Sequence, residues 1–166
     1  MTLFMDRRID ELLKKIVLNI SNHIKKNVDE KVIDSVIQFI KFGMVGVSNT
    51  LISYIINILV LMMLSNSIIE WDYVIANIVS FVLSVLWSFY WNNRYVFKLE
   101  NDTYRNVWKT LLKTYVAYGF TGIILSNILS FVWVTLLGIS KFIAPLLNLV
   151  IGVPINFLIN KKWAFK

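Results

Sequence analysis

Long uncharged stretches alternate along this chain with segments that are rich in Lys and Arg. Four stretches contain no charged residue: residues 42–64, 73–91, 114–140 and 142–160. Each reaches the roughly 17–25 residues that a helix needs to cross the hydrocarbon of a bilayer. The pattern predicts four transmembrane helices.

The beginning of the chain, residues 1 to about 38, has a different pattern. Apolar residues recur there at helical spacing between Arg, Lys, Asp and Glu, namely at Ile9, Leu12, Leu13, Ile16, Val17, Ile20 and Ile24. This spacing predicts an amphipathic helix that lies on the cytoplasmic leaflet. The alternative is a helix that packs on a partner protein or on loops of the bundle. Residues 39–166 then form the transmembrane domain.

The second and fourth uncharged stretches resemble each other when they are aligned 68 residues apart. The alignment pairs Ala76 with Ala144, Phe89 with Phe157, Asn92 with Asn160, Arg94 with Lys162, Tyr95 with Trp163 and Phe97 with Phe165. We therefore expect two repeats, about 39–97 and 111–165. Because two spans return the chain to its starting side, the repeats should be parallel. The expected fold is an all-α integral membrane protein with four transmembrane helices as two parallel two-helix repeats, preceded by an amphipathic cytoplasmic helix.

Composition and charge agree with this interpretation. The chain is 57% hydrophobic, its mean hydropathy is +0.66, and only 16% of its residues are charged, against about 25% in soluble domains. Its net charge of +7 does not indicate a nucleic-acid partner, because the bases flank apolar spans. They precede the first span, separate the second from the third and follow the fourth. Since basic loops are cytoplasmic, we expect both termini in the cytoplasm.

Small and polar residues inside the spans form a stripe on one face of each helix. They recur every four positions, at Asn49, Ser53, Asn57, at Ser80, Ser84, Ser88, Asn92, at Gly122, Ser126, Ser130, and at Asn148, Gly152, Asn156, Asn160. Such stripes allow close helix packing with hydrogen bonds across the contact. Alternatively they line a polar cavity, which the asparagines favour because an unpaired amide in hydrocarbon costs several kcal/mol. The sequence leaves both interpretations open.

The second and fourth spans end in similar hexapeptides, NNRYVF at residues 92–97 and NKKWAF at residues 160–165. Cations at headgroup depth pair with phosphate oxygens, amides bond hydroxyls, and aromatic rings contact sugar faces. Generic anchoring at the membrane interface is the alternative. The candidate residues for binding a lipid phosphate and sugar are Asn92, Arg94, Asn160, Lys161, Lys162, Trp163, Asn49 and Asn156.

Catalytic chemistry finds no support in this pattern. The four uncharged stretches contain no Asp, Glu or His, and the single His is His23 in the amphipathic region. The sequence has no nucleophile beside a base and no cluster of metal ligands. We expect a protein that is not an enzyme, with no cofactor and no metal site.

The same motifs resemble the GtrA-like family of bacterial membrane proteins. The resemblance runs from about residue 39 to residue 165 and rests on FGMVGVSNTL at 42–51, SFYWNNRYVF at 88–97 and NFLINKKWAF at 156–165. It implies a four-helix protein of the bacterial cytoplasmic membrane that acts in cell-surface polysaccharide synthesis. Asn92, Arg94, Asn160 and Lys162 match the family motif, as do Gly46 and Asn49.

The resemblance also implies a function and partners. Members are thought to move a polyprenyl-phosphate-linked sugar across the membrane, so that glycosyltransferases can decorate polymers such as teichoic acid. The expected partners are that lipid, the surrounding membrane lipids and a membrane glycosyltransferase. We also expect a second copy of the chain as a partner, because small four-helix transporters often need one to enclose a path. The alternative function is a scaffold that stabilises or recruits a glycosyltransferase and moves no lipid itself.

Overall fold

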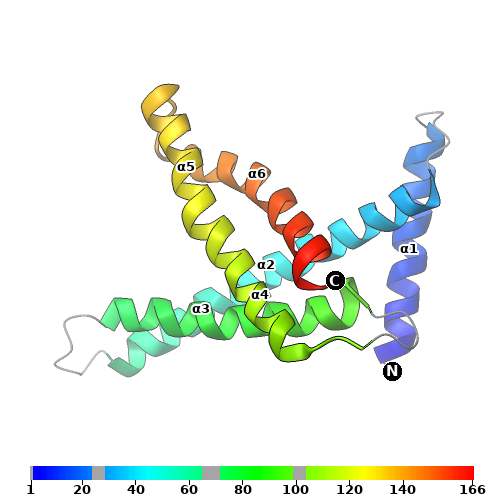
Figure 1. Ribbon diagram of the computed structural model, residues 1–166, viewed down its shortest axis with the longest axis horizontal. Helices are drawn as coiled ribbons and strands as arrows, with labels where there is room; N and C mark the ends of the chain where they lie inside the picture. The colour runs from blue at the N-terminus through cyan, green and yellow to red at the C-terminus, as the bar shows by residue number, and fades with distance from the viewer. Residues whose placement is uncertain (1, 24–28, 65–71, 99–103) are drawn as a thin grey trace.

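The computed structural model describes residues 2–23, 29–64, 72–98 and 104–166, and nearly all of them are helical (Figure 1). The α-helices are α1 (Thr2–His23), α2 (Glu30–Leu64), α3 (Asp72–Trp91), α4 (Val107–Gly119), α5 (Ser126–Ser130) and α6 (Ala144–Ile159). Four π-helical segments continue them: η1 (Asn92–Val96), η2 (Phe120–Leu125), η3 (Phe131–Leu136) and η4 (Asn160–Ala164).

The described residues include four helices that are long and apolar enough to cross a membrane. They are Glu30–Leu64, Asp72–Val96, Val107–Leu136 and Ala144–Ala164. Large apolar side chains cover their outside: Met63 is 80% exposed and Val150 is 72% exposed. Exposing such an apolar surface to water would raise the free energy of the protein, whereas contact with lipid tails does not. The predicted set of four spans is confirmed.

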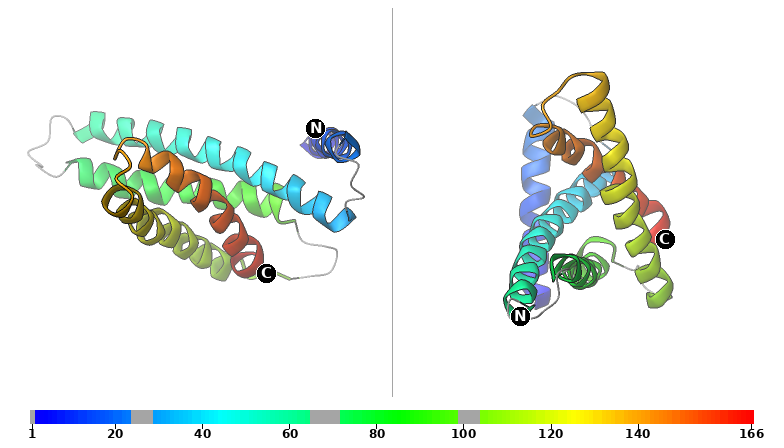
Figure 2. Two further views of the ribbon diagram at one scale, coloured as in Figure 1. Left: turned by 90° about the horizontal axis from the view of Figure 1, so that it is seen from above. Right: turned by 90° about the vertical axis from the view of Figure 1, so that its left-hand side faces the viewer.

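The spans form two antiparallel hairpins. One joins α2 to α3, and the other joins the helix from α4 through η3 to α6. Figures 1 and 2 show that the hairpins are close together where η1 and η4 lie and separate toward their connecting turns. The second turn begins at Gly138, whose positive φ of 66° suits a residue without a side chain. The N–H of Ile139 donates to the carbonyl of Trp133 over 2.8 Å, which closes the helix end.

Aromatic residues hold the hairpins together at the end where they meet. We call this set the phenylalanine cluster: Phe42, Phe89, Val96, Phe97, Phe157, Ala164 and Phe165. Ring centroids lie 5.9 Å apart both in the pair Phe89 with Phe165 and in the pair Phe97 with Phe157. In each pair one ring comes from each hairpin, and Phe89 with Phe157 and Phe97 with Phe165 are positions 68 residues apart in the sequence.

Helix α1 runs across the end of the bundle near the beginning of α2 (Figure 1). Asp10 forms an ion pair with Lys41 of α2, and its second carboxylate oxygen lies 3.7 Å from Lys98. The ammonium of Lys14 lies 2.9 Å from Glu30. The apolar side chains of Ile9, Leu12 and Ile16 are 40%, 62% and 45% exposed. Residues 30–38 belong to α2 itself, so the same helix continues into the first span.

Candidate functional site

The two asparagines that open the repeated hexapeptides lie in the protein interior. Asn92 and Asn160 are both fully buried and begin η1 and η4. The carbonyl of Asn92 accepts a hydrogen bond from the N–H of Phe97 at 2.8 Å, and that of Asn160 accepts one from Phe165 at 2.9 Å. Each bond spans five residues, so both hairpins end in the same π-helical turn.

Their side chains bond to neighbours on the same helix. Nδ2 of Asn92 donates to Oγ of Ser88 at 3.1 Å, and Nδ2 of Asn160 donates to Oδ1 of Asn156 at 2.9 Å. Ser88 Oγ in turn lies 2.5 Å from the hydroxyl of Tyr118 on α4. These amides therefore help to build the interior where the hairpins meet, and the predicted contact with a phosphate stays a prediction.

The basic residues of the hexapeptides divide into two kinds. Arg94 and Lys162 occupy equivalent positions and are exposed, and the guanidinium of Arg94 lies 5.8 Å from the ring centroid of Tyr95. Lys161 instead points inward, because its Nζ donates to Ser35 Oγ at 2.8 Å. Only the first two therefore present a cation at the surface of these segments.

Trp163 contacts Lys113, a residue of α4 in the same hairpin. Nζ of Lys113 donates to its backbone carbonyl at 2.8 Å and lies 5.3 Å from the centroid of its ring. The indole remains 41% exposed. An aromatic ring held by a cation beside exposed Lys162 suits the boundary between headgroups and hydrocarbon.

Arg105, which the sequence patterns did not single out, connects the ends of both hairpins. One terminal nitrogen donates to the carbonyl of Phe97 at 2.9 Å and to Oδ1 of Asn93 at 2.8 Å. The other donates to the carbonyl of Phe165 at 2.5 Å. Burial lowers the pKa of this guanidinium from its ordinary value, but a group so basic stays charged. Arg105 therefore neutralises carbonyls at the ends of both hairpins.

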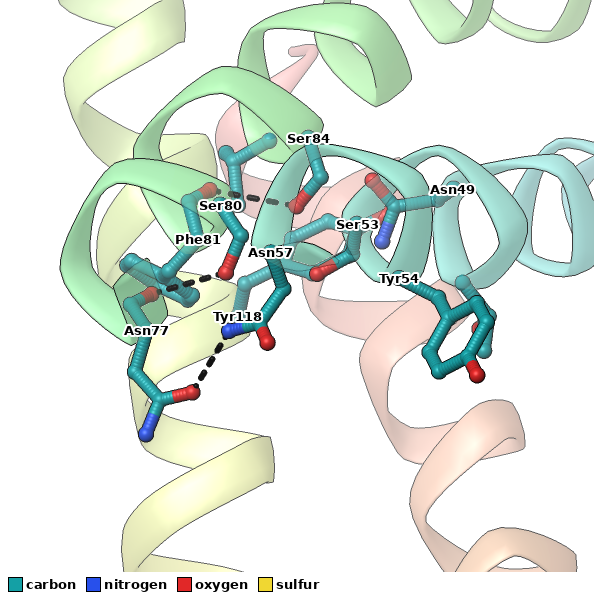
Figure 3. A pocket seen from close by; sticks show the side chains of 11 residues that line it. Asn49, Ser53, Tyr54, Asn57, Asn77, Ser80, Phe81, Ser84 and Tyr118 are labelled. Carbon is teal, nitrogen blue, oxygen red and sulfur yellow. Dashed lines mark hydrogen bonds between the residues drawn. The ribbon is translucent and has the colours of Figure 1, made fainter. Parts of the chain in front are cut away.

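A first cavity of about 420 Å³ lies between α2 and α3, with one wall residue from α4 (Figure 3). Its lining residues are mostly polar: Asn49, Thr50, Ser53, Tyr54, Asn57, Asn77, Ser80, Phe81, Ser84, Val85 and Tyr118. Nδ2 of Asn57 donates to Oδ1 of Asn77 at 2.9 Å across the two helices. The amide oxygen of Asn49 is buried and accepts no hydrogen bond from the described residues. The polar stripes of these two helices thus face a cavity.

A second cavity of about 410 Å³ lies between the third and fourth spans. It is lined by Thr121, Gly122, Ser126, Pro145, Asn148, Leu149, Gly152, Val153 and Asn156. Nδ2 of Asn148 bonds across the hairpin to Ser130 Oγ at 2.7 Å and to Ser126 Oγ at 3.1 Å. The stripes of the second hairpin therefore both face a cavity and bond across the helix contact.

The cavities contain hydroxyl and amide groups but no carboxylate, imidazole or amine among the described lining residues. Two of the predicted residues, Asn49 and Asn156, line the first and the second cavity respectively. Sequence reasoning missed Asn77 and Tyr118. Asn77 had a detectable signal, because it lies three residues before Ser80 and so extends the stripe of α3. Tyr118 had none, because it reaches the first cavity from the other hairpin.

These features define a multi-pass membrane protein, helical over nearly all of its described residues, with an open polar cavity between the helices of each hairpin. Over residues 41–165 the chain matches the GtrA/DPMS transmembrane domain, and it belongs to that family. The predicted resemblance is thereby confirmed.

Its relatives include proteins named for glycosylation of the cell wall. A cell wall teichoic acid glycosylation protein, GtcA, of Listeria innocua is 26% identical over 136 residues, which are 80% of this chain and 88% of that relative. A GtcA of Listeria monocytogenes is 30% identical over 115 residues, covering 68% and 76% of the two chains. No solved structure matches the chain.

Proposed function

We propose that this protein moves a polyprenyl-phosphate-linked monosaccharide across the bacterial cytoplasmic membrane, where it serves glycosylation of a cell-surface polymer such as teichoic acid. The carrying observation is the first cavity, in which Asn49, Asn57 and Asn77 line a space of about 420 Å³ within a hairpin of spanning helices. The names of the GtcA relatives support the link to teichoic acid.

The chemistry of the first cavity suits a neutral sugar. Asn57 and Asn77 use one donor and one acceptor on each other, and the remaining donors and acceptors of the three amides are of the kind that sugar hydroxyls need on leaving water. A cavity of this size falls within the range of about 300–1,000 Å³ typical of small-molecule sites. Exposed apolar side chains around it, such as Leu51 at 60% exposure, leave the prenyl chain in contact with lipid. The sugar itself brings no charge into this cavity.

The phosphate requires a different environment, and Arg94 and Lys162 supply it in this proposal. Both are exposed beside aromatic residues at the end where the hairpins meet. A cation there pairs with the phosphate in the headgroup layer while the sugar enters the membrane. The protein performs no covalent step in this scheme, so it is not an enzyme, and the lipid moves down its own gradient.

The proposal includes the orientation and the repeats. Both termini lie in the cytoplasm, and the hairpins are parallel repeats related by an axis along the membrane normal. The position of the bases supports the orientation, and the exchanged contacts of Phe89 with Phe165 and Phe97 with Phe157 support the repeats. Helix α1 lies on the inner leaflet with Leu12 toward lipid, which its exposed apolar side chains favour.

The test uses purified protein in liposomes that contain a fluorescent polyprenyl-phosphate-glucose. The measured quantity is the fraction of label that a membrane-impermeant reductant reaches, with and without protein. We expect protein-dependent exchange that falls about tenfold in the double variant Arg94→Gln, Lys162→Gln. Lys141→Gln, which removes a base from the turn at the opposite end, is the matched control and should keep full exchange.

Absence of exchange from folded protein would overturn the proposal. The scaffold alternative would then be tested by co-purification with a membrane glycosyltransferase, with and without residues 1–35. Chemical cross-linking in the same liposomes tests the expectation that the protein assembles as a homo-oligomer.

A further inference from the structure

The second cavity repeats the first at matched positions of the chain. Seven lining positions of the first cavity recur 68 residues later in the second: Ser53 and Thr121, Tyr54 and Gly122, Asn77 and Pro145, Ser80 and Asn148, Phe81 and Leu149, Ser84 and Gly152, and Val85 and Val153. The volumes, about 420 and 410 Å³, are nearly the same. In both hairpins the lining residues lie mostly in the half of the spans away from η1 and η4. Each hairpin therefore contributes a polar cavity, and Tyr118 of α4 also reaches the first one.

Asn148 gives the second cavity a fixed hydrogen-bond acceptor. The residue is only 8% exposed. Its Nδ2 donates to the backbone carbonyl and Oγ of Ser126, both at 3.1 Å, and to Oγ of Ser130 at 2.7 Å. These bonds fix the orientation of the amide. Its Oδ1 is buried and accepts no hydrogen bond from any residue that the structure describes.

A buried acceptor in this state can accept a hydrogen bond from a ligand that enters the cavity. Leaving an amide oxygen unpaired in a low-dielectric interior costs free energy that a hydroxyl donor recovers. The neighbouring glycines, Gly122 and Gly152, leave open space, because a Cβ added to either meets no atom within 4 Å. Thr121, Ser126 and Asn156 supply further polar groups in the wall. The cavity combines room for a ligand with an acceptor that the fold does not satisfy.

We infer that the second cavity is a separate binding site for the sugar hydroxyls of a lipid-linked monosaccharide, so that one chain holds two such headgroups, one in each hairpin. This inference rests on the proposed function for the class of ligand. The two sites differ in chemistry. The first presents the amides of Asn49, Asn57 and Asn77, whereas the second pairs Asn148 and Asn156 with the apolar Pro145, Leu149 and Val153. The second site therefore binds fewer hydroxyls and holds the sugar more weakly.

Gly122 and Gly152 provide a direct test. Both line the second cavity and have space for a side chain, so a leucine at either position would occupy part of the cavity. Gly152→Leu and Gly122→Leu are two independent filling variants. Gly119→Leu is the matched control: Gly119 lies in the same hairpin, its added Cβ also meets nothing within 4 Å, and it lines neither cavity. Size-exclusion profile and thermal melting establish that each variant is folded.

The probe is citronellyl-phosphate-glucose with a diazirine on the sugar, photolysed with the full-length protein in lipid nanodiscs. Mass spectrometry maps the labelled peptides. We expect label in residues 49–85 and also in residues 121–156. Each filling variant should lower the second label at least tenfold and leave the first unchanged, and Gly119→Leu should change neither.

Label confined to residues 49–85, or second-hairpin label that survives both filling variants, would overturn the second site. We also expect excess unlabelled probe, but not citronellyl phosphate, to compete with the labelling, because the cavity binds the sugar hydroxyls. Equal competition by the two lipids would overturn that specificity. Failure of this inference is distinguishable from failure of the proposed function. Transport with label in one hairpin only would contradict the second site alone. Label in both hairpins without transport would contradict the translocation alone.

Discussion

Phe97 and Phe165 stack with their ring centroids 4.7 Å apart, and the backbone carbonyls of these two residues share one guanidinium, that of Arg105. They are equivalent positions in the two halves of the chain and each follows a π-helical turn. Arg105 also lies 5.3 Å from the ring centroid of Phe165, so it adds a cation–π contact to the hydrogen bonds. A single side chain therefore binds the ends of both hairpins.

Replacing Arg105 with Gln should destabilise the folded protein. The change removes charge-assisted hydrogen bonds to the carbonyls of Phe97 and Phe165 and leaves both without their donor. We expect a loss of about 2–3 kcal/mol, seen as a lower midpoint in thermal unfolding in detergent. Arg105→Lys should not restore it, because an ammonium lacks the planar fork that reaches both carbonyls. The exposed Lys109→Gln is the control, and an Arg105→Gln melt equal to that control would contradict the role.

The stacked pair of rings should be energetically coupled. We expect Phe97→Leu and Phe165→Leu to destabilise the protein individually and to be less than additive together. The coupling should be about 0.5–1.5 kcal/mol, the range measured for aromatic pairs beyond their buried area. Chemical unfolding of the wild type, both single variants and the double variant gives this value. Strict additivity would mean that the stack contributes only by its size.

Variants of Asn57 and Asn77, which bond to each other, distinguish an effect on stability from an effect on transport. Asn57→Leu alone leaves Oδ1 of Asn77 without its donor and should cost about 1–2 kcal/mol. The double variant Asn57→Leu, Asn77→Leu removes both polar partners and should melt nearer to the wild type. Its lipid exchange in liposomes should nevertheless fall about tenfold or more, because the first cavity has lost two amides. A double variant with normal exchange would exclude a role of these amides in sugar binding.

The ion pair of Asp10 with Lys41 should hold α1 against the bundle. The Lys41 side chain is only 12% exposed, so salt screens this pair less than a surface pair. We expect Asp10→Asn to raise hydrogen exchange in Thr2–His23 roughly fivefold, which corresponds to a loss of about 1 kcal/mol, and to leave the spans unchanged. Glu11→Gln, a neighbouring neutralisation, is the control. Equal exchange in both variants would mean that other contacts dock α1.

Sequence alone was sufficient for the spans because bilayer thickness imposes a length on every uncharged stretch. It also located the polar stripes, since residues four apart share a helix face. Whether the stripes face a helix contact or a cavity could not be predicted, because both require small and polar residues. The burial of individual residues was also not predictable. Asn92 and Asn160 stand in segments that look interfacial, yet both are completely buried where the hairpins meet.

Arg105 could not have been found from the same patterns. Its partner Phe165 lies 60 residues away and offers a backbone carbonyl, a group that every residue has. In the sequence Arg105 is one base among several between the second and third spans. Only the meeting of the two helix ends distinguishes it from its neighbours.

The shared guanidinium also makes the molecule mechanically unequal along its length. Prising the hairpins apart at the phenylalanine cluster must break the hydrogen bonds of Arg105 together with the ring stacks, and these contacts fail as one unit. Spreading the connecting turns breaks none of them. These contacts therefore join the hairpins at one end, and the cavities lie in the other half of the protein.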